Sequence, residues 1–210
     1  MLPIVLCLLS IAPPDTLRIA PAARRPLLDG AADSLEYGAP SILIASARGA
    51  VRVWLRRWHD TVYLAASIPD FTPSSRDAFA ISLDRAGTRS AAPDHDDFQW
   101  DIRRVADSSV IYRGRDGRWQ PPLDDPDWRL GAERSGGGWE LATRNDAAGW
   151  SVEMRFDPAY FSGEGGRAPG IAFRIFDDDP SDWAVWPLAP ELKHPSELEQ
   201  RPALWAVVRP

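Results

Sequence analysis

Residues 61–84 read TVYLAASIPDFTPSSRDAFAISLD and contain two apolar stretches separated by a Pro/Ser-rich turn. Apolar residues recur at every second position, from Val62 to Ile68 in the first stretch and from Phe79 to Leu83 in the second. This period is typical of a β-strand with one buried face. We therefore predict two strands, each burying one face, and expect the rest of the chain to be built around them.

The composition favours a single β-rich domain. The 210 residues include 20 Pro and 15 Gly, which disfavour long helices and favour many turns. The 10 Trp and 7 Phe can supply a large apolar core without disulfides. The formal net charge of -6 argues against nucleic acid as a partner, because phosphate binding needs a basic surface.

The first 26 residues differ from the rest. The apolar run at residues 2–12 has the length of a signal-peptide core and is too short to span a bilayer; a buried first strand is the alternative. Cys7, the single cysteine, lies in this run, so its removal would leave no thiol for a disulfide or a metal. We expect residues 1–26 to be a signal-like segment and a Pro/Ala/Arg linker, with cleavage near Ala22 or Ala23. Residues 27–210 would then form one secreted or periplasmic domain with no membrane span.

Other segments show the same alternation between turn residues. Strands are predicted at residues 42–45, 50–58, 98–103, 109–112, 139–143, 150–156, 171–175 and 204–208. Trp54, which alternates with two arginines, is predicted to stack on them at the sheet surface. Residues 157–161, DPAYF, predict one helical turn with Asp157 as N-cap. Many short strands and almost no helix predict an all-β, antiparallel β-sandwich.

An ordered set of short motifs runs through this pattern. It consists of LLDG (27–30), TVYLAASIPD (61–70), RDAFAISLD (76–84), DDFQWDI (96–102), GWSVEMRFDPAYF (149–161), GIAFRIFDDD (170–179) and VWP (185–187). In these motifs and their order, residues 27–208 resemble carbohydrate-binding module family 9 and its DOMON-like relatives. The resemblance implies a jelly-roll-like sandwich that binds sugar ends in a cleft, often with structural calcium.

The sugar site implied by the resemblance is altered in this sequence. The family pattern has two tryptophans that sandwich the sugar and a nearby carboxylate. Ser74 stands at the first tryptophan position and Ala80 at the carboxylate position, while His194 is the one candidate in the loop expected to carry the second tryptophan. The residues we expect to bind carbohydrate instead are Trp183, Trp186, Gln99, Arg103 and His194. Two further aromatic candidates are Trp119 and Trp128, and packing in the core or at a sheet edge is the alternative for every tryptophan.

Three acidic clusters are candidates for a structural calcium site, with solvated turns as the alternative. They are Asp94, Asp96 and Asp97; Asp124, Asp125 and Asp127; and Asp177, Asp178, Asp179 and Asp182. The three histidines lack the spacing of zinc ligands. No G-x-S-x-G, P-loop or H-E-x-x-H motif occurs, so we expect a protein that is not an enzyme.

Two other functions stay open. Some DOMON-like relatives bind haem through a methionine with a lysine or histidine, which makes Met154 and Lys193 a candidate pair, although Met154 shares its strand face with core residues. The other alternative is an envelope interaction domain that has lost sugar binding. Our main expectation is a monomeric, non-catalytic domain that binds a saccharide or polysaccharide and assists polysaccharide breakdown.

Overall fold

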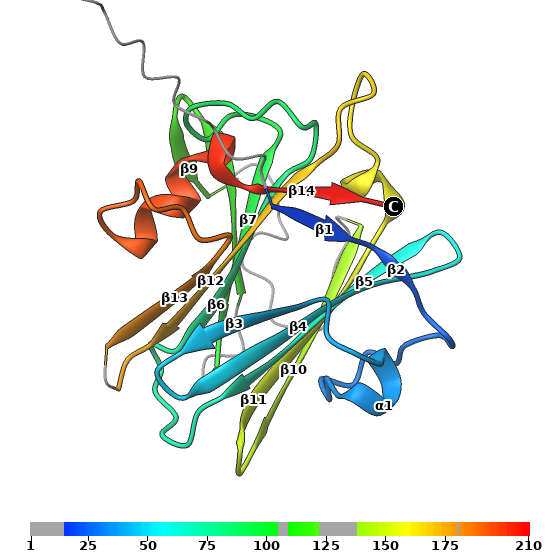
Figure 1. Ribbon diagram of the computed structural model, residues 1–210, viewed down its shortest axis with the longest axis vertical. Coiled ribbons are helices and arrows are strands. Elements are labelled where there is room, and N and C mark those ends of the chain that lie inside the picture. Colours follow the sequence, from blue (N-terminus) through cyan, green and yellow to red (C-terminus); the bar gives the residue numbers. More distant parts are fainter. Residues whose placement is uncertain (1–14, 105–108, 122–137, 180) are drawn as a thin grey trace, which may run out of the picture.

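The structure is a computed structural model that describes residues 15–104, 109–121, 138–179 and 181–210, and it consists of two β-sheets packed face to face (Figure 1). Within these residues the first sheet has eight strands: β1 (Thr16–Arg18), β14 (Ala206–Arg209), β12 (Gly170–Asp177), β13 (Asp182–Trp186), β6 (Ala78–Asp84), β7 (Asp97–Arg103), β8 (Ser109–Arg115) and β9 (Arg118–Gln120). The second described sheet has six: β10 (Trp139–Asp146), β11 (Gly149–Phe156), β5 (Thr61–Pro69), β4 (Gly49–Trp58), β3 (Ile42–Ser46) and β2 (Ala20–Pro21). The short helices are α1 (Ser34–Tyr37), η1 (Pro158–Phe161), η2 (Pro195–Gln200) and η3 (Pro202–Leu204). The prediction of an all-β sandwich is confirmed.

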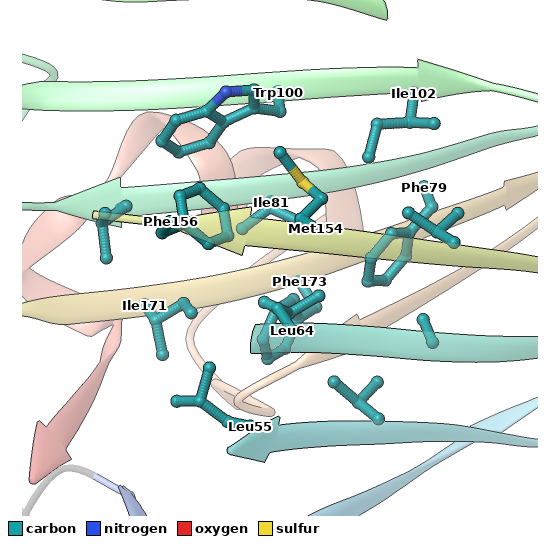
Figure 2. Packing of buried hydrophobic residues seen from close by; sticks show 14 of the residues in the cluster. Leu55, Leu64, Phe79, Ile81, Trp100, Ile102, Met154, Phe156, Ile171 and Phe173 are labelled. Carbon is teal, nitrogen blue, oxygen red and sulfur yellow. The ribbon is translucent and has the colours of Figure 1, made fainter. Parts of the chain in front are cut away.

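The two strands predicted in residues 61–84 exist, and they belong to different sheets. β5 is in the six-stranded sheet and β6 in the eight-stranded sheet, so the connecting turn joins the two layers. The inward residues of both strands meet in one apolar core, where Phe79 stacks on Phe173 with ring centroids 5.8 Å apart. Figure 2 shows this core, with Leu64 of β5 among the residues between the sheets. The turn therefore places the two halves of the core together.

The prediction that each of these strands buries only one face is wrong. On β5, Tyr63 and Ala65 point outward but are buried with Trp54 in a second cluster next to α1. On β6, Ala80 and Ser82 point outward and are only 1% and 3% exposed. On β5 the segment around α1 covers the outward residues, whereas on β6 the outward residues are small and lie between longer side chains of β7 and β12.

Trp54 does not stack between arginines at the surface, which corrects the prediction for this residue. Its side chain is 1% exposed, lies 5.9 Å from the ring of Tyr37, and donates a hydrogen bond from Nε1 to the carbonyl of Gly38 at 2.9 Å. The segment around α1 thus covers it. Buried indoles normally have such a partner for the N–H group.

The folded region begins before residue 27, so part of the predicted linker is structured. β1 pairs in parallel with β14, and β2 pairs in parallel with β4, which are exceptions to the antiparallel prediction. In Figure 1 the blue β1 lies beside the red β14. Leu17 and Ile19 are 1% and 7% exposed and belong to the main core. Cleavage near Ala22 would remove both strands and these two core side chains.

The LLDG motif forms a loop held by a buried acid of β11. The Glu153 side chain is fully buried, and its carboxylate accepts hydrogen bonds from the backbone N–H groups of Asp29 at 2.9 Å and Gly30 at 2.6 Å. It also accepts a bond from the Tyr37 hydroxyl at 2.7 Å. Gly30 has φ of 80°, and a Cβ there would lie 2.7 Å from the backbone of Thr143. Only glycine fits this close approach.

We expect Glu153→Gln to lower the free energy of unfolding by about 1–3 kcal/mol, because an amide cannot accept all three hydrogen bonds and would leave a buried donor unpaired. Burial raises the pKa of Glu153, so the wild type gains stability as pH falls while the glutamine side chain does not titrate, and the difference between variant and wild type should be larger at acid pH. Urea unfolding at pH 7 measures the effect. Glu140→Gln, at a partly exposed ion pair, is the control, and an equally small loss in both variants would contradict this account.

Candidate functional site

The outer face of the eight-stranded sheet carries a row of functional side chains above a floor of small residues. Strand pairing sets Asp101 of β7 beside Ala80 of β6, and Ala80 beside Arg174 of β12. In the next row outward, Arg103 lies beside Ala78. Because alternate residues share one face of a strand, these side chains all point away from the core. Polar groups therefore surround a floor of alanines.

Trp183 forms the aromatic end of this face. It lies on β13 opposite Phe176 of β12, with ring centroids 4.6 Å apart. The guanidinium carbon of Arg174 lies 5.0 Å from the centre of the Trp183 ring, and the exposed His194 meets this ring edge-on at 5.5 Å. Trp183 remains partly exposed. The fold thus brings together two of the predicted residues, Trp183 and His194.

Gln99 is part of this face but is not exposed. Its side chain is 4% accessible, and Nε2 donates to Ser82 Oγ at 3.2 Å and to Glu199 Oε2 at 3.0 Å. Glu199 Oε2 also lies 2.6 Å from Arg174 Nε in an ion pair. Burial raises the pKa of Glu199, although Arg174 favours its charged form. Gln99 is therefore a residue that orients Glu199, and its role in carbohydrate binding stays a prediction.

Arg103 lies at the opposite end of the face and is about one-third exposed. Its Nη2 donates to Asp101 Oδ2 at 2.7 Å, and its Nη1 donates to the carbonyl of Arg76 at 3.0 Å. Ser74, at the position where the resemblance implies a tryptophan, donates from Oγ to Asp178 Oδ2 at 2.8 Å. The rim is therefore polar where the family pattern has an indole.

Trp186 does not face this site. It lies on β13 opposite Phe173, stacks on that ring at 5.9 Å, and packs against the main core. The physical reason is alternation: residues 183 and 186 are an odd number of positions apart and lie on opposite faces. This corrects the prediction that Trp186 binds carbohydrate. Trp119 is also engaged, stacked at 6.2 Å on Trp205, and Trp128 lies outside the described residues.

Four residues of this face were missed by the sequence analysis: Asp101, Tyr112, Arg174 and Glu199. The outward position of Arg174 could have been predicted from the sequence, because this residue alternates with the apolar Ile171, Phe173 and Ile175 in the motif GIAFRIFDDD. The position of Glu199 could not be predicted in this way, because Glu199 belongs to η2 and reaches the sheet only through the packing of η2 against β12 and β13. Tyr112 lies next to Gln99 in the sheet, and burial raises its pKa.

The first predicted acidic cluster contains two buried carboxylates, Asp96 and Asp97, with oxygens that lack hydrogen-bond partners among the described residues. Asp96 and Asp97 are 2% and 0% exposed, and among the described residues both oxygens of Asp96 and Oδ1 of Asp97 have no hydrogen-bond partner. Oxygens of Asp94 and Asp96 and a nitrogen of His95 lie within 4.8 Å of one another. Burial raises the pKa of Asp97 to about 8 and that of Asp96 to about 6. Such a cluster needs a cation or protons.

The third acidic cluster is neutralised by arginines instead. Asp177 pairs with Arg48 at 3.0 Å and also lies close to Asp70 and Asp77, where Arg104 is the counter-ion. Asp182 accepts the N–H of Ala47. The second cluster, residues 124–127, lies outside the described residues.

The candidate haem ligands are not brought together. Met154 is fully buried in the main core, and Figure 2 shows it close to Trp100 and Phe156. Lys193 is exposed in the segment between β13 and η2. Core packing thus accounts for Met154.

Comparisons with known proteins identify the fold. No family model matches the chain, and no curated protein sequence is similar to it. Two solved structures of a carbohydrate binding module family 9 domain from Caldicellulosiruptor kristjanssonii match it, one in complex with glucose and one with cellotriose. Their TM-scores are 0.59 and 0.58 at 16% and 15% identity, each over 93% of this chain and over 95% and 93% of theirs.

The chain is thus a two-layer β-sandwich of the kind found in carbohydrate-binding modules. Its fold is that of carbohydrate-binding module family 9, as the ordered motifs indicated. Among the described residues, no helix combines the length and apolar character needed to cross a membrane.

Proposed function

We propose that this protein is a non-catalytic carbohydrate-binding domain whose site is the outer face of the eight-stranded sheet. The observation that carries the proposal is the partly exposed indole of Trp183, set among Arg174 and His194 on the same face as Asp101 and Arg103. An indole packs against the C–H groups of a pyranose, while arginine and carboxylate groups hydrogen-bond to its hydroxyls. Solved structures with the same fold contain glucose and cellotriose.

The proposed site differs from a two-tryptophan clamp. Ser74 is hydrogen-bonded to Asp178 at the rim, and His194 takes the place of a second indole. A sugar would therefore stack on one side only. We expect an affinity in the millimolar range, weaker than a two-sided sandwich would provide, because less apolar area is buried.

The acids of this face favour binding rather than catalysis. Asp101 pairs with Arg103 and Glu199 with Arg174. A glycosidase needs one carboxyl free to give up a proton and a second free to act as base or nucleophile. Both acids here already have arginine partners, and this supports a role in holding hydroxyl groups.

Calorimetric titration with glucose and cellotriose, together with a glycan array read with and without EDTA, tests the proposal. We expect saturable binding of at least one saccharide, with the longer ligand bound at least as tightly as glucose. Absence of binding to every saccharide at millimolar sensitivity would contradict it and favour an interaction domain.

We further propose that the protein acts outside the cytoplasm, secreted or periplasmic, as an accessory to polysaccharide breakdown. The apolar run at residues 2–12 supports export. Because β1 starts at Thr16, a cleavage site before that residue would keep the described sandwich whole. Mass spectrometry of the protein from the envelope fraction would show the mature N-terminus, and a full-length cytoplasmic protein would contradict export.

We also propose that Asp94, Asp96 and Asp97 hold a structural calcium ion. The buried oxygens without partners fit a hard cation that prefers carboxylate ligands. When bound, the ion would supply positive charge to a cluster that burial otherwise forces to retain protons. Its role would be to fix the loop between β6 and β7.

Calcium is expected to raise the melting temperature relative to protein in EDTA. At a concentration about 100 times the dissociation constant, the stabilisation would be about 2.7 kcal/mol, which corresponds to a shift of about 5–10 °C for a domain of this size. Asp96→Asn should abolish the shift, while Asp179→Asn, in the cluster neutralised by Arg48, should retain it. Equal melting temperatures in calcium and EDTA would contradict the calcium site.

A further inference from the structure

A pocket of about 280 Å³ opens on the outer face of the six-stranded sheet, opposite the proposed saccharide site. Residues of β4, β5, β10 and β11 line it, together with the segment just before α1. Its walls include the apolar Ala32 and Trp150, which are both buried. The proposed function does not use this pocket.

A cross-strand row of two arginines and two serines forms one side of this pocket. Arg52 of β4 pairs with Ser67 of β5, Ser67 pairs with Ser151 of β11, and Ser151 pairs with Arg144 of β10. All four lie on the outer face and line the pocket. With neighbouring strands about 4.8 Å apart, the Cα atoms of the two arginines are about 14 Å apart. Their long side chains can therefore converge above the serines.

The two guanidinium groups of this row are uncommitted. Within the described residues, neither Arg52 nor Arg144 makes a hydrogen bond or an ion pair through its side chain. Several other arginines of this protein are engaged by carboxylates, as Arg104 is by Asp70 and Arg174 is by Glu199. Free guanidinium groups in a pocket are suited to bind an oxyanion, because their paired N–H donors match its oxygens.

Asp33 and Asp146 also line the pocket, and one oxygen of each carboxylate accepts backbone donors. Asp33 Oδ1 accepts the N–H groups of Leu35 and Glu36 at 2.8 and 2.9 Å, as the N-cap of α1. Asp146 Oδ1 accepts two N–H groups in the turn between β10 and β11, at 2.7 and 3.0 Å. These bonds hold both carboxylates in their turns, and among the described residues neither carboxylate forms an ion pair with Arg52 or Arg144. The Ser67 hydroxyl, between the arginines in the row, is a further donor for a ligand oxygen.

We propose that this pocket is a second ligand site that binds an oxyanion group, namely a sulfate, phosphate or carboxylate, through Arg52, Arg144 and Ser67. The anion can be a free ion or a substituent of an acidic saccharide. Both sources present the same oxygens to the arginines, and the pocket volume accommodates either. The site lies on the other sheet and does not depend on sugar binding at Trp183.

Titration of the full chain by NMR, at constant ionic strength set with NaCl, tests this site. The probes are inorganic sulfate, inorganic phosphate, glucose 6-sulfate and glucose. We expect saturable shifts of the backbone amides of Ser67, Ser151 and Arg144 with the anions and none there with glucose. Tighter binding of glucose 6-sulfate than of sulfate identifies a saccharide substituent as the ligand, and equal binding identifies a free ion; both results support the site.

Variants that replace an arginine by the neutral glutamine distinguish binding at this pocket from a general attraction of anions to the positive charges of the protein. Arg52→Gln and Arg144→Gln should each weaken anion binding about 10-fold or more, because each removes a charge-assisted donor pair. Arg115→Gln, at an exposed position on the other sheet, should have no effect, and Trp183→Ala should leave anion binding unchanged. Absence of saturable anion shifts in the wild type, or an equal loss in Arg115→Gln, would overturn the proposal. Loss of sugar binding alone would leave it intact.

Discussion

Replacing Arg104 by methionine is expected to lower the free energy of unfolding by about 3–5 kcal/mol at pH 7. Arg104 follows β7 and is 4% exposed; its Nη1 lies 2.5 Å from Asp70 Oδ2 and 3.6 Å from Asp77 Oδ2. It also donates to Asn145 Oδ1 at 2.9 Å and to the carbonyl of Gly149. Asp70 and Asp77 are 2% and 1% exposed. The variant would leave two buried carboxylates without their cation.

The pH dependence of this loss identifies its cause. Burial already raises the pKa of Asp77, and removal of the guanidinium would raise it further. A carboxyl whose native pKa is raised binds protons more readily in the folded state, so stability is lost as pH rises and recovered as pH falls. The deficit of the variant should therefore shrink between pH 7 and about pH 4. Urea unfolding at several pH values measures it.

A control variant shows whether the loss of stability is specific to Arg104. Arg115→Met removes an exposed arginine of the same sheet and should change stability by less than about 0.5 kcal/mol. A loss below about 1 kcal/mol in Arg104→Met, or a loss independent of pH, would contradict the assignment of Arg104 as the counter-ion that joins the two layers.

Replacing Trp183 by alanine is expected to weaken saccharide binding by about 10- to 30-fold. This range corresponds to about 1.4–2 kcal/mol, which is typical when an aromatic anchor of a binding site is truncated. Trp183 lies on the surface side of β13, so its loss should remove the stacking platform while leaving the main core unchanged. Calorimetry with cellotriose measures the affinity, and a melting curve checks the fold.

Two further variants test whether stacking is the cause. Trp183→Phe keeps an aromatic face and should retain most of the affinity. Trp58→Ala removes a partly exposed indole of the six-stranded sheet and should leave saccharide binding unchanged. An unaltered affinity in Trp183→Ala would place the sugar elsewhere.

Alternation in the sequence was sufficient to predict the strands with large inward side chains. In β6 and β12 the apolar residues at every second position are all in the core, as predicted. The two-residue spacing of apolar side chains indicates only which face of a strand is buried, so it could not show that β5 and β6 belong to different sheets. β1 and β2 were missed because they are short and lie among prolines, with only Leu17 and Ile19 as a signal.

The site was predicted less completely because its charges pair across segments distant in sequence. Trp183 and His194 flank one loop, so their proximity could be anticipated. Glu199 reaches Arg174 only because the chain folds back through η2, and Arg104 reaches Asp70 only because the two layers meet. Neither ion pair can be recognised from the residues next to it in the sequence. The assignment of Trp186 failed for a different reason: residues 182–186 were not among the predicted strands, so the alternation that puts Trp183 and Trp186 on opposite faces was not applied.

The central claim is that a saccharide binds on the outer face of the eight-stranded sheet, and NMR titration of the labelled protein with cellotriose tests it most directly. We expect saturable shifts of the Trp183 indole N–H, of the Arg103 side chain and of His194, with no change at Ser67 or Ser151 on the opposite sheet. No shifts at cellotriose concentrations of tens of millimolar, or shifts confined to the six-stranded sheet, would contradict the claim.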